Sequence, residues 1–523
     1  MSRFVRRLLA PADALLNRWY GWRCNPLYHS GALVVLTFVL LLITGLYLVF
    51  FYRLGSPHAS IVRITEQAWL GRWIRSLHRY ASDAAVVAAA VHALRMFAQD
   101  RSWGPRALAW VSGLLLVGLT FVLGWTGYVM VWDVQGMVLA REGARLMDAL
   151  PLFAEPISRA FVGERELPSA FFFLNLFLHV ALPIGLGALL WLHVSRVARA
   201  GLLPPRGLLW ATTGALLALS VLWPAPAGTP ADLFRLPSTG PYDAFYAFWL
   251  PLTQGLPAVA VWVGAGFAGA VAVLTPWWSR PRTESPRPSV VNERLCTGCE
   301  QCYLDCPYEA IAMVDRTDGR AGLVARVDPA LCVSCGICAG SCAPMGVGPP
   351  GRTGRDQLAR IRDFVAALPP GGDVVVLACS HGAGGAARAS TLDGAAVLPV
   401  DCAGSLHTSV VEYLVRSGVG GVLIVACPPR DCKNREGPKW LEQRLFHQRE
   451  AELKDRVDRR RVRLVHAGLA EAGTVAAELE RSRREAAALG RSRREATIVL
   501  DAECELERPE GPQRPQGVEG ARR

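Results

Sequence analysis

The sequence lacks a recognisable secretory signal peptide. Residues 1–23 carry arginines in an amphipathic pattern, without the short apolar core and small-residue cleavage site that such a signal requires. Cysteine is also scarce over most of the chain, because only Cys24 of the 14 cysteines precedes residue 296. A disulfide framework needs an oxidising compartment, so we expect the cysteine-rich remainder to be reduced and cytoplasmic.

Charged residues are few, at 19% of the chain, and the hydrophobic share of 51% is high for a wholly soluble protein. Apolar stretches long enough to cross a membrane occupy residues 30–275. The formal net charge of +12 is compatible with nucleic-acid binding, but the arginines cluster at the ends of the apolar stretches. That placement follows the positive-inside rule, so we predict no nucleic-acid partner.

The apolar stretches predict six membrane-spanning helices, the fifth of them only marginally long for a hydrocarbon core of about 30 Å. Four arginine clusters flank these helices and share one side of the membrane. That side should be cytoplasmic, so we expect a multi-pass protein of a prokaryotic inner membrane with both termini in the cytoplasm. The predicted spans are residues 31–52, 76–98, 108–131, 171–194, 207–223 and 255–275.

Four histidines lie inside these spans at matched spacing. His78 and His92 in the second span are 14 residues apart, and so are His179 and His193 in the fourth. Fourteen residues make nearly four helical turns, which places both histidines of a helix close to one face and about 21 Å apart. Intramembrane ionisable residues are costly, and imidazole is a common axial ligand of haem, so two bis-histidine haem b sites are predicted. The alternative is a simple bond to a neighbouring helix.

Four glycines repeat the same spacing on the other two helices of the predicted core. Gly31 and Gly45 lie on the first span, and Gly113 and Gly127 lie on the third. A missing side chain lets a flat macrocycle approach the backbone, which predicts haem packing. Close helix–helix contact is the alternative explanation.

These features resemble the cytochrome b family of quinol-oxidising complexes over roughly residues 25–275. The resemblance implies an outer haem on His78 and His179 and an inner haem on His92 and His193. Arg79 and Arg95 then stand where they could neutralise haem propionates or, alternatively, contact phospholipid. The segments that carry the resemblance are R-S-L-H-R-Y (75–80), V-H-A-L-R (91–95), G-W-T-G-Y-V-M-V-W-D (124–133), F-L-H-V (177–180) and W-L-H-V (191–194).

The same resemblance implies a quinone site near the outer haem. The family usually has a Pro-Glu-Trp-Tyr segment there, where this chain reads G-P-Y-D-A-F-Y-A-F-W-L-P (240–251). Asp243 is the predicted substitute for the missing glutamate as a proton acceptor, the alternative being an ordinary loop carboxylate. His29 occupies the position where cytochrome b6-type relatives tether an additional haem through cysteine, which argues against a third haem here.

Two cysteine motifs follow the bundle and read C-T-G-C-E-Q-C-Y-L-D-C-P (296–307) and C-V-S-C-G-I-C-A-G-S-C-A-P (332–344). Their spacing is typical of two [4Fe-4S] clusters, in which the fourth cysteine of each motif ligates the other cluster. Structural zinc is the alternative, although it usually takes two separated pairs. The segment resembles bacterial two-cluster ferredoxins. The first predicted cluster takes Cys296, Cys299, Cys302 and Cys342, and the second takes Cys332, Cys335, Cys338 and Cys306.

Three β-rich runs near the C-terminus, residues 374–379, 396–402 and 422–427, each end in a cysteine. They predict a small parallel α/β sheet with Cys379, Cys402, Cys427 and Cys432 at its carboxyl edge. The segment resembles the small iron–sulfur (delta) subunit of methyl-viologen-reducing hydrogenases and the matching domain of some heterodisulfide reductase flavoproteins. That resemblance implies a [2Fe-2S] cluster and docking onto a larger redox partner, with inert buried thiols as the alternative.

A glycine-rich segment, G-A-G-G-A-A (382–387), also follows a predicted strand, with Asp401 about twenty residues on. It formally matches a dinucleotide-binding fingerprint, but the cysteine directly before it fits a metal site better.

The chain is therefore predicted to be a multidomain protein with an all-α transmembrane bundle of six spans, a ferredoxin-like domain and a small α/β domain. We expect a subunit of a quinone-linked oxidoreductase, in which electrons pass from a cytoplasmic hydrogenase or heterodisulfide-reductase-like partner through the C-terminal cluster, the two cubanes and the two haems to quinone. A homodimer through the bundle is also expected. The alternatives are a membrane anchor without haem-dependent electron transfer, and quinol oxidation that drives reverse flow.

The predicted boundaries are 1–278 for the cytochrome b-like bundle, 279–290 for a linker, 291–346 for the 2[4Fe-4S] domain, 358–468 for the α/β domain, and 469–523 for a charged helix and disordered tail.

Overall fold

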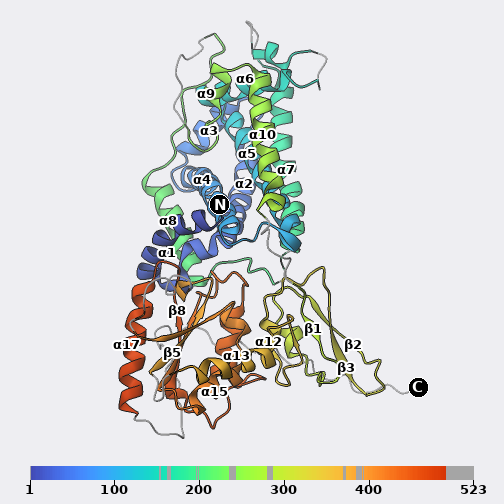
Figure 1. The fold of residues 1–523 in the computed structure, drawn as a ribbon. Coiled ribbons are helices and arrows are strands. Elements are labelled where there is room, and N and C mark those ends of the chain that lie inside the picture. Colours follow the sequence, from blue (N-terminus) through green and yellow to red (C-terminus); the bar gives the residue numbers. More distant parts are fainter. Residues whose placement is uncertain are drawn as a thin grey trace, which may run out of the picture.

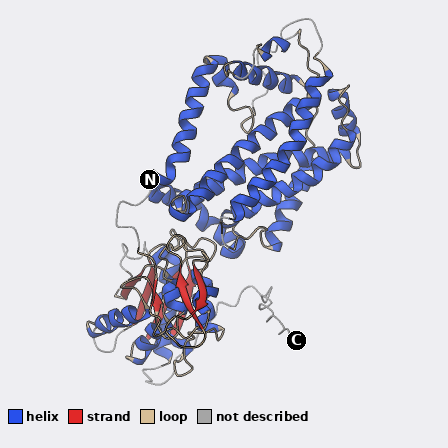
Figure 2. Ribbon diagram, turned by 90° about the vertical axis from the view of Figure 1, so that its right-hand side faces the viewer, coloured by secondary structure: helices blue, strands red, loops and turns tan. Residues whose placement is uncertain are grey.

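A helical bundle stands on two small domains that contain all the described strands (Figures 1 and 2). The computed structural model describes residues 2–151, 155–161, 167–195, 197, 199–234, 243–279, 287–368, 373–384, 392 and 394–489. Most of the predicted linker (280–286), the start of the predicted quinone segment (240–242), part of the glycine-rich segment (385–387) and the tail (490–523) lie outside the described residues.

The bundle contains ten described α-helices. Five helical segments are long and apolar enough to cross a membrane, and they confirm five of the six predicted spans by length and composition. The fifth predicted span, α8, has 17 residues, or about 26 Å at 1.5 Å per residue, so it is shorter than a typical hydrocarbon core. The helices are α1 (Ser2–Cys24), α2 (Ser30–Phe51), α3 (Pro57–Glu66), α4 (Gly71–Ala98), α5 (Ala107–Val131), α6 (Val134–Asp148), α7 (Ser169–Ser195), α8 (Arg206–Leu222), α9 (Leu250–Gly255) and α10 (Ala258–Trp278).

Two helix pairs form the centre of the bundle, with α2 packed on α4 and α5 packed on α7. The outward faces of these helices are apolar and exposed, as at Leu42, Leu46 and Phe50, which are 62–78% accessible. Such a surface is unfavourable in water but suits lipid, and the helical backbone satisfies its own hydrogen bonds there.

The ferredoxin-like domain is built from short elements around its cysteines. Strand β1 (Val290–Val291) pairs with β4 (Val347–Gly348), and β2 (Ile311–Asp315) pairs with β3 (Leu323–Val327), both antiparallel. Helices α11 (Gln301–Leu304) and α12 (Ile337–Ser341) each carry a cysteine of one motif. Cys302, Cys306, Cys338 and Cys342 belong to the core of the domain, so the cluster positions and the fold depend on each other.

The C-terminal domain contains a four-stranded parallel sheet in the order β6-β5-β7-β8. Strands β5 and β7 are buried along their whole length, as expected for a parallel sheet with helices on both faces. The predicted parallel sheet is confirmed, and β8 adds a strand that the sequence pattern did not indicate. The elements are α13 (Gly354–Ala366), β5 (Val374–Cys379), β6 (Ala396–Val400), α15 (Thr408–Arg416), β7 (Gly421–Ala426), α16 (Gly437–Phe446), β8 (Val462–His466) and α17 (Ala472–Ala488).

Helix α17 begins just beyond residue 468, the predicted end of the α/β domain, and packs against the sheet (Figure 1). Its residues Val475 and Leu479 are buried in the core beside β5 and β7. The segment 472–488 is thus an amphipathic helix that covers one face of the sheet.

Candidate redox-cofactor sites

The four intramembrane histidines face each other in two pairs. His78 on α4 and His179 on α7 have ring centres 6.4 Å apart. An iron ligated by one nitrogen of each ring at about 2 Å would hold the ring centres about 6 Å apart, so this outer pair fits a bis-imidazole haem.

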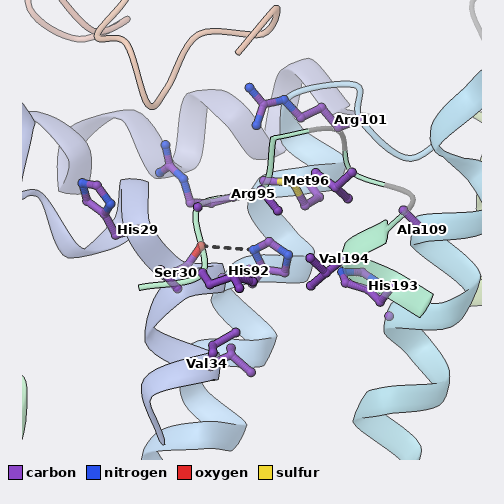
Figure 3. Close-up of a pocket in the computed structure, with 18 of the residues that line it drawn as sticks. His29, Ser30, Val34, His92, Arg95, Met96, Arg101, Ala109, His193 and Val194 are labelled. Carbon is purple, nitrogen blue, oxygen red and sulfur yellow. Dashed lines mark hydrogen bonds between the residues drawn. The ribbon is translucent and has the colours of Figure 1, made fainter. Parts of the chain in front are cut away.

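His92 and His193 form the inner pair, at the end of the bundle next to the soluble domains. Both line a cavity of about 580 Å³, a volume within the usual range for cofactor pockets (Figure 3). The structure therefore brings together both pairs that the matched spacing indicates.

Each predicted glycine lies directly against one of these histidine rings. A Cβ atom at any of the four positions would come within about 3 Å of an imidazole carbon, which is tighter than ordinary van der Waals contact. The glycines thus admit the imidazole rings, and their packing against a macrocycle stays a prediction. The distances from the added Cβ to histidine Cε1 are 2.8 Å for Gly31 to His92, 3.2 Å for Gly45 to His78, 3.2 Å for Gly113 to His193 and 3.1 Å for Gly127 to His179.

Hydroxyl residues that the sequence analysis missed support the same four rings. The residue before each glycine is serine or threonine, and its hydroxyl oxygen lies within hydrogen-bond range of the histidine Nδ1. The contacts are Ser30 to His92 at 3.4 Å (Figure 3), Thr44 to His78 at 2.8 Å, Ser112 to His193 at 3.1 Å and Thr126 to His179 at 2.9 Å. The repeated hydroxyl–glycine dipeptide, again at a spacing of 14, is the sequence signal that would have identified them.

For the two threonines, the direction of the hydrogen bond to histidine follows from the second partner of the hydroxyl. Thr44 Oγ1 donates its proton to the Leu40 carbonyl at 2.6 Å, and Thr126 Oγ1 donates to the Val122 carbonyl at 3.0 Å. Each hydroxyl must then accept from the imidazole, so the proton sits on Nδ1 and Nε2 keeps its lone pair. This tautomer is the one that a metal-ligating histidine needs.

The two predicted propionate partners are already engaged. Arg79 forms ion pairs with Asp83 and, at 2.5 Å, with Asp243. Arg95 is 3% exposed and donates to Asp13 on α1 and to Asp431 of the C-terminal domain, both at 2.6 Å. Each arginine therefore joins elements that lie far apart in the sequence.

Asp243 is a buried, fully engaged carboxylate. Its Oδ2 accepts from Arg79 and from the Tyr128 hydroxyl. Its Oδ1 accepts from the backbone N–H groups of Phe245 and Tyr246, both at 2.7 Å. These four contacts hold the Asp243 side chain in one orientation beside α4 and α5.

Cations dominate the mouth of the inner cavity. Arg101 donates to the carbonyls of Cys432 and Lys433, and Arg435 donates to those of Pro307 and Arg199, so neither charge is neutralised by these contacts. Burial lowers the pKa of Arg101 to about 10, which leaves it charged at neutral pH. Carboxylate groups of a bound cofactor would be stabilised here. The basic residues that line the cavity are Arg95, Arg101, Arg106, Arg199, Arg430, Arg435 and Lys439.

The eight ferredoxin cysteines separate into the two predicted sets. Cys296, Cys299, Cys302 and Cys342 line one small cavity, so the last cysteine of the second motif joins the first three of the first motif. Conversely, Cys306 of the first motif lies beside Cys332, Cys335 and Cys338. Their role as cluster ligands stays a prediction.

The surroundings of these sulfurs suit ligation. N–H groups of Ser289, Ala310 and Gly346 point at cysteine sulfurs over 3.2–3.4 Å, an arrangement that stabilises thiolates bound to iron. Burial raises the pKa of the Cys338 thiol to about 12, so it stays protonated unless a metal replaces the proton. Among the residues that the structure describes, no three His, Cys, Asp or Glu side chains are placed to hold a single metal ion.

The four C-terminal cysteines converge at the carboxyl edge of the parallel sheet. Cys379 ends β5, and its sulfur lies 3.6 Å from that of Cys427, directly after β7. The Cys432 sulfur lies within hydrogen-bond range of the sulfurs of Cys402 and Cys427. All four side chains are at most 2% exposed, so the donor set fits a buried cluster of more than one metal ion rather than a single-ion site.

The glycine-rich segment beside these cysteines is tightly packed where it is described. A Cβ at Gly382 would come 3.2 Å from the Cys427 sulfur, and one at Gly384 would come 2.7 Å from the Cys379 carbonyl oxygen. Asp401 pairs instead with Arg352 at 2.9 Å. The described part of the segment is therefore packed against Cys379 and Cys427.

A buried charge network joins the two soluble domains. Arg444 of the C-terminal domain is fully buried and donates to the Ser341 hydroxyl at 2.9 Å and to the Gly404 carbonyl at 2.7 Å. Asp305 of the ferredoxin domain accepts from Ser341 and pairs with Arg444 and Arg449. Burial lowers the pKa of Arg444 to about 10, so its guanidinium remains charged at neutral pH.

Comparison with known proteins agrees with this three-part organisation. The family models that match are "Cytochrome b/b6/petB" at residues 18–201, "4Fe-4S dicluster domain" at 295–346 and "Methyl-viologen-reducing hydrogenase, delta subunit" at 374–490. Each segment matches the family predicted for it. Asp243, α8 and α10 lie beyond the cytochrome b match.

The curated relatives include two cytochrome b subunits. They are the menaquinol:cytochrome c reductase cytochrome b subunits of Geobacillus thermodenitrificans and Bacillus subtilis (strain 168), 28% and 27% identical over 195 residues. Each match covers 35% of this chain and 86% of the relative. A solved structure described as "Hyperthermophilic respiratory Complex III" is similar at 17% identity and a TM-score of 0.39, over 52% of this chain and 80% of that one.

Proposed function

We propose that this protein is a membrane-bound electron-transfer subunit that passes electrons between a cytoplasmic redox partner and membrane quinone through iron–sulfur clusters and two b haems. The observation that carries the proposal is the repeated unit of histidine, glycine and hydroxyl at two levels of one helical bundle. The similarity to cytochrome b subunits of menaquinol:cytochrome c reductases supports quinone as the membrane substrate.

The haems would be held by His78 with His179 and by His92 with His193, and they would supply one-electron chemistry on both sides of the membrane. Because Arg79 and Arg95 are paired with carboxylates, Arg101, Arg106 and the loop arginines of the C-terminal domain are better placed for the inner propionates. The inner end would face the cytoplasm, where the soluble domains lie.

The soluble half would connect the bundle to a hydrogenase or heterodisulfide-reductase-like protein. The two cubanes would use Cys296, Cys299, Cys302 and Cys342, and Cys332, Cys335, Cys338 and Cys306. Cys379, Cys402, Cys427 and Cys432 would hold the [2Fe-2S] cluster. Ferredoxin-type clusters commonly lie low in the range of about −700 to +450 mV, so flow toward quinone is favoured. Reverse flow would need the membrane potential, at about 2.3 kcal/mol per charge per 100 mV.

Asp243 would act at the outer quinone site as a proton acceptor, with Arg79 and Tyr128 holding its carboxylate in place. We expect Asp243→Asn to slow quinol oxidation while both haem spectra stay normal. Unchanged quinol oxidation would instead assign Asp243 to positioning Arg79 and the loop at 243–246.

The redox spectrum of the purified full-length protein tests the central proposal. Wild type should show two bis-histidine b-type signals, His92→Ala should lose the inner one, and His78→Ala the outer one. Electron transfer between the soluble partner and quinone should then fail in both variants. Absence of the two signals, or full partner activity in His92→Ala, would favour the membrane-anchor alternative. Electron paramagnetic resonance of the reduced protein would count the clusters.

A further inference from the structure

We propose that the Cys432 loop, rather than the ferredoxin domain, delivers electrons to the inner haem site, and that the ferredoxin domain faces the soluble partner. This inference rests on the proposed function and reverses the order in which the sequence analysis placed the soluble clusters. It gives the C-terminal cluster an internal position between the cubanes and the bundle.

The loop at 428–435 leaves the end of β7 and contacts the bundle through buried groups. Asp431 Oδ1 accepts from Arg95 at 2.6 Å and from the Gln99 amide, and the Cys432 carbonyl accepts from Arg101. Arg95, Gln99, Asp431 and Cys432 are 2–6% exposed. A buried carboxylate without partners is strongly unfavourable, so these contacts hold the loop in one position.

The same residues lead to the inner histidine. Arg95 follows His92 on α4 by about one helical turn, Gln99 caps the end of the helix one turn further on, and all three line the inner cavity. A short path of hydrogen bonds and one helical turn therefore connects Cys432 with His92. Electron transfer slows steeply with distance, so such direct contact favours this route.

The C-terminal cysteines and the cysteines of the first cubane differ in how far solvent reaches them. The four C-terminal cysteines are at most 2% exposed, which gives a soluble partner no direct approach to their sulfurs. In contrast, Cys299 is exposed, and Tyr303 and Leu304 beside it are 41% and 40% exposed. The first cubane position is thus the accessible one.

The ferredoxin domain and the C-terminal domain contact each other close to their cysteines. Arg435, three residues after Cys432, donates to the carbonyl of Pro307, which directly follows Cys306. The proposed order is therefore soluble partner, first cubane, second cubane, C-terminal cluster, inner haem.

The ferredoxin domain also contacts the bundle directly, because Glu309 pairs with Arg199 at 4.0 Å and Tyr308 contacts Arg106. The Tyr308 hydroxyl accepts from Arg106, whose guanidinium also lies over the Tyr308 ring at 4.9 Å. Tyr308 lies two residues after Cys306, so a direct route from the second cubane would pass here. Asp431 and Tyr308 thus offer matched positions for distinguishing the two routes.

Electron paramagnetic resonance of the full-length protein tests proximity independently of turnover. Radiolytic reduction of the frozen, oxidised protein traps reduced clusters beside the still oxidised inner haem; the reduced C-terminal cluster should then speed the spin relaxation of that haem, and Cys432→Ser should abolish this effect while the cubane signals remain. Unchanged relaxation enhancement in Cys432→Ser would overturn the route. Missing haem signals in wild type would instead refute the proposed function itself.

Two further variants leave all cysteines in place. Asp431→Ala should speed hydrogen exchange in the loop at 428–435 and slow inner-haem reduction by a photoreduced soluble ferredoxin at least tenfold. Tyr308→Phe, which removes the hydroxyl that contacts Arg106, should leave the rate of haem reduction unchanged. The opposite pattern, in which inner-haem reduction is slow in Tyr308→Phe and normal in Asp431→Ala, would overturn the proposal.

Discussion

Replacing Thr126 with valine removes one hydroxyl from the outer histidine level and preserves the shape of the side chain. The Thr126 hydroxyl lies 2.9 Å from His179 Nδ1 and is itself tied to the backbone of α5. Thr126 is fully buried, so water cannot replace the lost acceptor. The imidazole N–H of His179 would then lose its best-placed acceptor and keep only the neighbouring Leu123 carbonyl.

A buried donor that loses its acceptor costs about 1–3 kcal/mol. At about 1.4 kcal/mol per factor of ten, haem affinity at the outer site should fall roughly 5- to 150-fold, in line with the 10–100-fold losses typical of such supporting residues. The imidazole also becomes a weaker electron donor without its acceptor, so the midpoint potential of the outer haem should rise relative to that of the inner haem.

Haem content and a spectroscopic redox titration of the two haems measure both effects. Thr120→Val is the matched control, because Thr120 is also buried on α5 but its hydroxyl donates to the Leu116 carbonyl at 2.8 Å and contacts none of the four histidines. The role assigned to Thr126 would be refuted if the two variants had the same haem content and the same outer-haem potential, or if only the inner haem changed.

Two other substitutions test the site and the domain contact. Gly31→Ala places a Cβ 2.8 Å from His92 Cε1, so the inner haem should be lost and the outer haem retained. Gly118→Ala on α5 is the control: its added Cβ has no other atom within 4 Å, so it should stabilise the helix by up to about 1 kcal/mol. Full inner-haem content in Gly31→Ala would contradict this prediction. Arg444→Met leaves a buried carboxylate short of a partner and should destabilise the soluble half by about 3 kcal/mol, measured by denaturant unfolding followed by cluster absorbance. Arg416→Met should cost at most about 1 kcal/mol, because Arg416 is exposed and its partner Glu412 keeps a second ion pair with Arg456. Similar costs for the two arginine variants would show that the buried network contributes little.

The sequence predicted the histidine pairs well because helical geometry converts a spacing of 14 residues into two levels on one face. The supporting hydroxyls escaped notice, since a serine or threonine in a membrane helix commonly bonds only its own backbone. Thr44 and Thr126 do that as well, and only the packing of α2 on α4 and of α5 on α7 reveals their second partner.

The arginine partners were beyond sequence reasoning for a different reason. Arg79 and Asp243 are 164 positions apart, and Arg95 and Asp431 are 336 apart. Local pattern indicates that a charge lies at a helix end, but it does not indicate which distant loop folds back to neutralise it. Strand β8 was missed similarly, because Arg463 interrupts its apolar run and is buried beside Glu478 and Glu485 of α17.

The hydroxyl–glycine helices and the histidine helices have a consequence for the origin of the bundle. The hairpin of α2 and α4 and the hairpin of α5 and α7 carry the same set in the same order: serine–glycine, threonine–glycine, then an outer and an inner histidine. Two copies of one hairpin, related by a twofold axis along the membrane normal, would generate this arrangement. A single ancestral hairpin would thus have needed only to dimerise to create both sites at once. The serine of the inner level and the threonine of the outer level are shared by both copies, so the two levels would already have differed in that hairpin, and only the differences between the copies would have arisen later.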